Sequence, residues 1–107
     1  MGEKKSEFGV IFAIVNNGFA DDAMLVAREA GARGGTIIRA RGSSNIGVDK
    51  KYGLTITPEK EVLMIVANEG TKDAIMDAIY RESIKNSAMK AVVFSLPVNE
   101  TFGLKYD

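Results

Sequence analysis

The chain of 107 residues contains no cysteine, no histidine and no tryptophan. Without cysteine it can form neither disulfides nor sulfur-based zinc sites, which agrees with a reducing compartment. Without histidine it lacks the side chain that exchanges protons near neutral pH, so Ser/His and Cys/His nucleophile systems and imidazole-bound metals are excluded. We therefore expect no catalysis, no metal site and no covalently bound cofactor.

An excess of charge of one sign and long apolar runs are also absent. Lys plus Arg and Asp plus Glu each number 14, so no overall field attracts nucleic acid or an anionic membrane. Residues 1–7 are polar, and the apolar run at residues 10–15 is too short for a signal peptide or a membrane span. We predict a cytoplasmic protein of one domain, small enough that part of its apolar surface needs a partner.

Two segments of the chain repeat an apolar run, a turn and a helix start. Ile14-Val15 recurs as Ile65-Val66, and Asp22-Ala23 recurs as Asp73-Ala74. A strand followed by a helix, present twice, predicts two βαβ halves that share one sheet. Common secondary-structure needs can produce the same pattern, so a genuine duplication is one of two explanations.

Local patterns predict four strands in the order βαββαβ. Residues 8–15 are nearly all apolar and predict a central strand buried on both faces, and residues 62–67 predict a second continuously apolar strand. Residues 36–41 alternate and predict a half-exposed strand that carries Arg39 and Arg41 on one face. Residues 91–96 predict the last strand.

Capping residues mark the two predicted helices. Asn17 is the candidate N-cap of the first helix, and Gly31 is expected to stop it after a stripe of small residues, Ala20, Ala23, Ala27 and Ala30. Thr71 is the candidate N-cap of the second helix, which is expected to end near Asn86.

Glycine, arginine and hydroxyl groups concentrate between residues 31 and 45. Glycine lets backbone N–H groups converge on an anion, and arginine binds phosphate oxygens with a planar fork, although no Walker or G-x-G-x-x-G pattern is present. Lys90, in the short turn before the last strand, is a second candidate anion ligand. The alternative for both segments is a helix C-cap, a tight turn and solvated surface.

Carboxylates lie near one another at Asp21 and Asp22, Glu59 and Glu61, and Glu69 and Asp73. The first and last sets start helices, where they complement the helix dipole. An enzymatic alternative, a small hydrolase or isomerase using such a pair, has no nucleophile with an adjacent base.

The strand at residues 11–15, the segment from Gly31 through Thr36 to Gly42, the long glycine-containing loop after it and Leu96-Pro97-Val98 resemble the PII-type nitrogen-regulatory protein superfamily in order and spacing. The resemblance covers nearly the whole chain. It implies one PII-like domain over residues 1–107 with an α+β, ferredoxin-like βαββαβ two-layer sandwich, a four-stranded antiparallel sheet and two helices on one face.

The same resemblance implies a homotrimer that binds an adenine nucleotide, AMP, ADP or ATP, in clefts between subunits. Residues 42–57 correspond to the T-loop of the family and would regulate a membrane transporter or a metabolic enzyme. The implied nucleotide-binding residues are Thr36, Arg41, Gly42, Ser43, Ser44, Ser87, Lys90 and Lys105, and the implied partner-binding residues are Asn45, Lys50, Lys51 and Tyr52. Which signal is sensed, nitrogen or another, stays open.

The chain also departs from the family pattern. Ser43-Ser44-Asn45 replaces an aromatic-Gly-Arg-Gln run, Ser87-Ala88-Met89 replaces the Gly-Asp-Gly of the B-loop, and Gly103-Leu104-Lys105 replaces a C-terminal Arg-x-Arg. Each lost charge-assisted hydrogen bond is worth about 1.5 to 3 kcal/mol, so we do not expect tight ATP binding. A trimeric interaction protein that binds no nucleotide is therefore the alternative function, and we do not expect modification of Tyr52.

Overall fold

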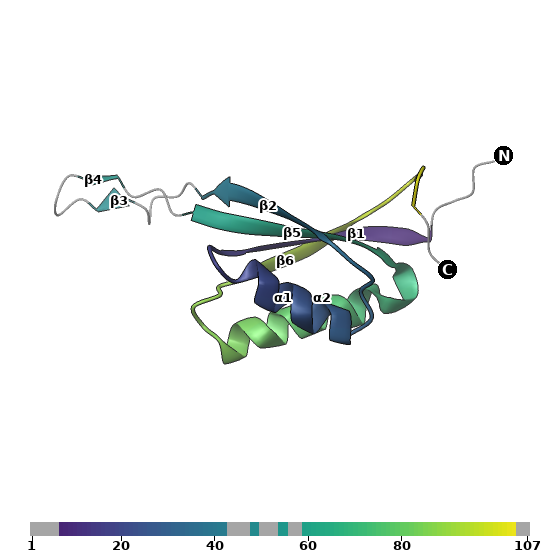
Figure 1. The fold of residues 1–107 in the computed structure, drawn as a ribbon, viewed down its shortest axis with the longest axis horizontal. Coiled ribbons are helices and arrows are strands. Elements are labelled where there is room, and N and C mark those ends of the chain that lie inside the picture. Colours follow the sequence, from purple (N-terminus) through teal and green to yellow (C-terminus); the bar gives the residue numbers. More distant parts are fainter. Residues whose placement is uncertain (1–6, 43–47, 50–53, 56–58, 105–107) are drawn as a thin grey trace.

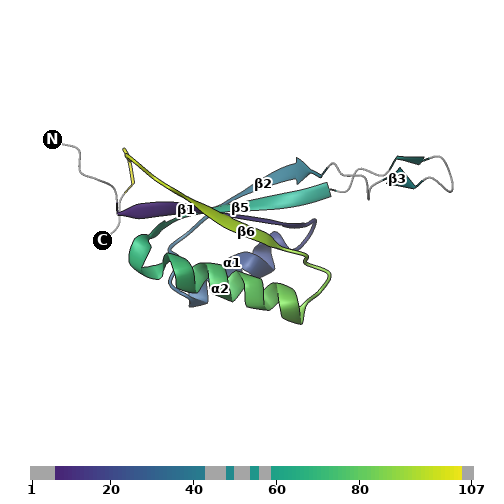
Figure 2. The same cartoon turned by 180° about the vertical axis from the view of Figure 1, so that it is seen from behind.

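The computed structural model describes residues 7–42, 48–49, 54–55 and 59–104. Along the chain the elements are β1 (Phe8–Asn16), α1 (Ala20–Glu29), β2 (Thr36–Arg41), β3 (Val48–Asp49), β4 (Leu54–Thr55), β5 (Glu59–Asn68), α2 (Glu69–Lys85) and β6 (Val92–Pro97). Four strands form an antiparallel sheet in the order β2-β5-β1-β6, and β3 pairs with β4 separately. Both helices lie on the same side of the four-stranded sheet (Figures 1 and 2). The predicted ferredoxin-like βαββαβ sandwich is confirmed.

β1 runs through the sheet between β5 and β6, and its residues alternate between the two faces. Ile11, Ala13 and Val15 are fully buried beneath the helices, whereas the residues between them are half-buried. The prediction that this strand is buried on both faces is wrong for this chain, because both helices pack on one face and no helix in the described ranges covers the other. The β5 residues opposite alternate in the same way.

Small side chains allow α1 to lie close to the sheet, as the sequence pattern predicts. Ala20, Ala23 and Ala27 are buried, and α2 contributes Ile75 and Ile79, both fully buried. These helix residues meet the buried positions of the two central strands. The resulting core consists of Ile11, Ala13, Val15, Ala20, Ala23, Met24, Ala27, Leu63, Ile65, Ala67, Ile75, Ile79 and Met89.

Gly35 lies where α1 and the sheet approach the backbone closely. A Cβ at this position would lie 3.0 Å from Ile65 Cγ1 and Met24 Sδ, and 3.1 Å from Leu63 Cδ1. A Cβ on the neighbouring Gly34 would meet no heavy atom within 4 Å. Close packing therefore favours glycine at position 35, where a Cβ would force core side chains to shift, but not at position 34.

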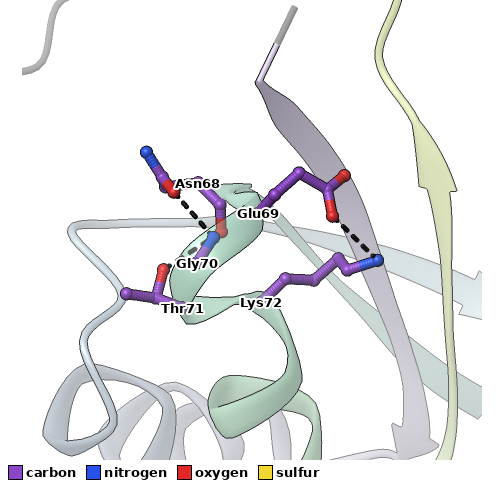
Figure 3. Close-up of polar contacts among 5 residues, drawn as sticks. All are labelled: Asn68, Glu69, Gly70, Thr71 and Lys72. Atoms are coloured by element: carbon purple, nitrogen blue, oxygen red, sulfur yellow. Dashed lines mark hydrogen bonds and ion pairs between the residues drawn. The ribbon is translucent and has the colours of Figure 1, made fainter.

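The N-terminus of α2 differs from the prediction (Figure 3). The Asn68 side chain accepts a hydrogen bond from the Gly70 N–H at 2.7 Å, and Thr71 Oγ1 donates to the Asn68 carbonyl at 3.2 Å. Glu69 and Lys72, in the first turn, form an ion pair of 3.3 Å. The prediction of Thr71 as the N-cap is wrong, because Asn68 has the extended backbone and the side-chain oxygen that cap this helix.

The other boundaries lie close to their predicted positions. β5 extends the predicted strand at residues 62–67 on both sides, and β6 is displaced by one residue from the predicted range 91–96. Gly31, with φ of 118°, follows the end of α1, and Asn86 is the C-cap of α2, as predicted. None of the helices in the described ranges combines the length and the apolar character needed to cross a lipid bilayer.

Candidate functional site

The base of the predicted T-loop lies at one end of the sheet. β2 ends at Arg41, which Gly42 follows, and β5 begins at Glu59, directly opposite Arg41. β1 ends beside them, with Asn16 opposite Lys60. Figure 1 shows β3 and β4 beyond this end of the sheet. The loop base therefore combines the ends of three neighbouring strands.

The turn between α2 and β6, which includes Ser87 and Lys90, lies at the same end. Met89 is fully buried and anchors the turn, whereas Ser87 and Lys90 are exposed. Lys90 has a φ of 49°, in the left-handed region. Because Lys90 precedes one edge strand and Arg41 ends the other, about three strand spacings, or about 14 Å, separate them. One chain places these two basic residues at the same end of the sheet without joining them in one pocket.

Asn16 connects the loop base to this turn through hydrogen bonds. Its Oδ1 accepts from Lys60 Nζ at 2.6 Å, and its Nδ2 donates to the Ala88 carbonyl at 2.8 Å. Its backbone N–H donates to the Met89 carbonyl at 3.0 Å. Three segments that are distant in sequence are thus held together by one side chain and its backbone. No local pattern in the sequence predicts this role of Asn16, and the neighbouring Asn17 is the residue predicted to act as a cap.

Glu61, a residue of β5, caps the N-terminus of α1. Its Oε1 accepts hydrogen bonds from the backbone N–H groups of Gly18 at 3.1 Å and Ala20 at 2.9 Å. Phe19 occupies the N-cap position and makes no side-chain cap. The prediction of Asn17 as the N-cap is therefore wrong, because a carboxylate delivered by β5 satisfies the helix terminus. Asp21 and Asp22 do lie in the first turn, as predicted.

Thr36 and the glycine-rich segment before it lie at the opposite end of β2 from Arg41. Thr36 begins the strand and is opposite Met64. The preceding residues Gly31, Ala32 and Arg33 line a cavity of about 270 Å³ together with Phe8, Val66, Ala67, Asn68 and Thr71. In the sequence, the glycines and the strand arginines form one candidate anion-binding segment. In a single chain, however, the glycines lie before the start of β2 and Arg41 lies at its end.

The remaining predicted site residues lie outside the described ranges. They are Ser43, Ser44 and Lys105 of the nucleotide set, and Asn45, Lys50, Lys51 and Tyr52 of the partner loop. Within residues 7–42, 48–49, 54–55 and 59–104, no three Asp or Glu side chains are grouped closely enough to hold a metal ion.

The face of the sheet opposite the helices, here called the open sheet face, is apolar. The register aligns Val10, Phe12 and Ile14 of β1 with residues of β5 and β6 on this face. Phe12 and Phe94 stack at a centroid distance of 5.3 Å, yet Phe94 keeps 40% and Leu96 51% of its surface exposed. The apolar residues of the open sheet face are Val10, Phe12, Ile14, Ile38, Val62, Met64, Val66, Val92, Phe94 and Leu96. An apolar surface that spans four strands is typical of an interaction site.

Comparison with known proteins identifies solved structures that share this fold. No protein-family model matches the sequence, and no curated protein matches it either. A DUF3240 family protein from Shewanella baltica superposes with a TM-score of 0.69 at 16% identity, over 94% of this chain and 99% of that one. CPII, a nitrogen regulatory PII-like protein from Thiomonas intermedia bound to ADP, AMP and bicarbonate, gives 0.68 at 15% identity, over 94% and 100%.

PII from Arabidopsis thaliana, bound to citrate, gives a TM-score of 0.62 at 20% identity, over 88% of this chain and 77% of that one. At these identities the likeness concerns the fold. The chain has the PII-like fold, and the resemblance inferred from its sequence is confirmed at that level.

Proposed function

We propose that this chain is a divergent PII-like regulatory protein, with one domain over residues 1–107. It assembles as a homotrimer and binds a small anionic effector, an adenine nucleotide, between subunits. It regulates a transporter or a metabolic enzyme through residues 42–57. The observation that carries the proposal is a PII-like fold whose basic candidate residues are divided between the two edges of one sheet.

The open sheet face supports self-association. It presents apolar side chains from all four strands, and the aromatic pair of Phe12 and Phe94 joins the central strand β1 to the edge strand β6. Burial of apolar surface stabilises association by about 25 cal/mol for each Å² removed from water. A small domain that leaves this face uncovered gains stability when copies of the chain cover it.

The division of the basic residues supports binding between subunits. Arg41 lies at one edge of the sheet and Lys90 at the other, so one chain alone does not bring these two residues to the same phosphate group. Association of two chains can place the Arg41 edge of one beside the Lys90 edge of the next. Charged groups from two chains would then bind the same phosphate group.

The structural relatives support the class of effector. CPII was solved with ADP, AMP and bicarbonate, and Arabidopsis PII with citrate, all of them small anions. The glycines of the B-loop are absent here, which favours a nucleotide with fewer phosphates than ATP.

Analytical ultracentrifugation of the wild type tests the assembly. We expect a species of three times the 11.5 kDa chain mass. Phe94→Lys places a charge on the open sheet face and should shift the population to monomer. Phe102→Lys is the matched control, because Phe102 is 94% exposed and lies outside the sheet. A monomeric wild type, or equal effects of the two substitutions, would contradict the trimer through this face.

Titration calorimetry with AMP, ADP, ATP and cyclic nucleotides tests the effector. Lys90→Ala should weaken nucleotide binding about 10-fold, corresponding to one charge-assisted hydrogen bond. Lys85→Ala removes the same charge from the last turn of α2 and serves as the control. Absence of heat with every nucleotide would remove the nucleotide part of the proposal.

The alternative is a trimeric interaction protein that binds no nucleotide. The hydrogen bonding of the turn favours it: the carbonyls of Ala88 and Met89 are both occupied by Asn16, and the Met89 N–H donates to the Asn86 carbonyl at 3.0 Å. Two carbonyl groups and one N–H group of the turn are thus already hydrogen-bonded within the chain. Under this alternative, Lys90→Ala leaves the amount of partner bound unchanged, and a loss of partner binding would reject it.

A further inference from the structure

A shallow depression marks the end of β2 at the loop base. It has a volume of about 300 Å³, enough for a small anion or one acidic side chain. Its lining comes from the end of β2, the start of β5 and the residue after β1. The lining residues are Asn17, Arg39, Ala40, Arg41, Glu59 and Lys60.

The depression carries a local excess of positive charge. Its lining includes three basic residues, Arg39, Arg41 and Lys60, and one carboxylate residue, Glu59. Lys60 donates to the neutral side chain of Asn16 and not to a carboxylate. The whole chain is neutral, so this excess arises from local arrangement.

Neither strand arginine has an ion-pair partner within the ranges that the structure describes, where the ion pairs are Glu69–Lys72 and Asp77–Arg81. Guanidinium groups are always protonated, so both arginines carry a full charge.

The position of Glu61 explains why Arg39 lacks a counter-ion. The register of β2 and β5 places Arg39 opposite Glu61 and Arg41 opposite Glu59, an arrangement in which opposite charges usually pair across strands. The Glu61 carboxylate instead accepts the Gly18 and Ala20 N–H groups at the start of α1. Capping the helix withdraws one of the two carboxylates, which leaves Glu59 as the acidic group beside two guanidinium groups.

We propose that Arg39 and Arg41 form a binding site for a carboxylate or phosphate group. Two planar guanidinium forks two residues apart on the same strand face can each donate paired N–H groups to such an oxoanion. The retained Glu59 limits the net charge of the site, which favours a group with one or two negative charges over a triphosphate.

The site differs from the proposed nucleotide clefts in one of its two arginines. Arg39 is not among the residues implied in nucleotide binding, and Arg41 is the residue the two sites share. By register, Arg39 and Arg41 lie on the face of the sheet that carries the helices, not on the open sheet face. The anion site therefore lies off the open sheet face and requires no adenine group.

NMR titration of the full-length protein tests the proposal, with the ionic strength held constant by sodium chloride. Inorganic phosphate and citrate are the small-ion probes, and a hexaglutamate peptide blocked at both ends represents an acidic segment of a partner. We expect saturable shifts of the Arg39 and Arg41 backbone and Nε resonances. Tighter binding of phosphate or citrate identifies a free anion as the ligand, and tighter binding of the peptide identifies an acidic protein segment.

Substitutions give the decisive comparison. Arg39→Gln should weaken binding of the tighter probe at least about 10-fold, and Arg39→Lys should have an intermediate effect because it keeps the charge and loses the fork. Arg28→Gln is the matched control, since Arg28 is an exposed arginine in the last turn of α1.

Two results would overturn the proposal: shifts that do not saturate with any probe, or equal weakening by Arg39→Gln and Arg28→Gln. Heats of nucleotide binding should be unchanged in Arg39→Gln. Failure of the nucleotide proposal would leave the phosphate, citrate and peptide titrations intact, so the two failures are distinguishable.

Discussion

Replacement of Glu61 tests how the two halves of the fold are joined. Its Oε1 is the acceptor for two backbone N–H groups at the start of α1, at 2.9 and 3.1 Å. Loss of an N-terminal cap costs about 0.5 to 2 kcal/mol, and a hydrogen bond to a charged group contributes about 1.5 to 3 kcal/mol. Because one oxygen serves both donors, the two contributions are not additive. We predict that Glu61→Ala lowers the free energy of unfolding by about 2 kcal/mol.

Glu61→Gln separates the hydrogen bond from the charge. The amide keeps an acceptor oxygen but loses the charge that complements the helix dipole, so we expect a loss of about 0.3 to 1 kcal/mol. Glu59→Ala is the matched control, two residues away on the same face of β5, because its side chain makes no hydrogen bond or ion pair within the described ranges. It should change stability by less than about 0.5 kcal/mol.

Urea unfolding at one fixed protein concentration measures these differences, because self-association makes stability depend on concentration. Amide hydrogen exchange at Gly18 and Ala20 gives the local measurement and should accelerate in Glu61→Ala more than at the far end of α1. The reasoning fails if Glu61→Ala and Glu59→Ala are equally stable, or if exchange at the two amides is unchanged.

Two further substitutions test packing and polar connections. Gly35→Ala should destabilise the protein by about 1 to 3 kcal/mol, because its Cβ would press against three core side chains, whereas Gly34→Ala should be neutral or slightly stabilising in the same urea experiment. Equal stabilities of the two variants would contradict the close approach of α1 to the sheet. Asn16→Ala should cost about 1 to 3 kcal/mol and speed amide exchange in the turn that contains Lys90, and Asn17→Ala, which keeps the Asn16 bridge, should do neither. Protection of that turn in Asn16→Ala equal to wild type would show that the bridge does not hold it.

Much of the fold follows from local pattern. The alternation at Thr36–Arg41 predicts a half-exposed strand whose residues divide between two faces, and the register confirms that division. The alanines of α1 predict close packing on the sheet, and Ala20, Ala23 and Ala27 are buried. These features depend on residues within one or two turns of each other, so the sequence carries them directly.

Features that depend on distant residues were missed. The cap of α1 is provided by Glu61, an acceptor 41 positions away from Ala20 in the sequence, and Asn17, the local candidate, has no part in it. At the second helix, Asn68 resembles a turn residue in the sequence. In the structure, however, β5 ends at Asn68 and α2 begins at Glu69 without an intervening loop. Its capping role becomes visible only when the strand is seen to extend through it.

The candidate site divides in the same way. Lys90 and Arg41 are recognisable as candidate anion ligands from residue type and family resemblance. Their separation by the width of the sheet, and the position of Thr36 at the far end of β2, follow from strand order, which no local pattern contains.

The amino-acid sequence by itself determined which chemistry is absent, since no pairing of chain segments can supply a thiol or an imidazole, and it determined the βαββαβ order through the periodicity of its apolar residues. The tertiary structure decided how the polar groups are used. It directs the Glu61 carboxylate to the start of α1 and not to the guanidinium of Arg39, and it joins Lys60 to the turn beside β6 through Asn16. It also places both helices of the described residues on one face of the sheet. Antiparallel pairing sets residues far apart in the chain against one another and sends alternate side chains to opposite faces, and both helices pack against one of those faces.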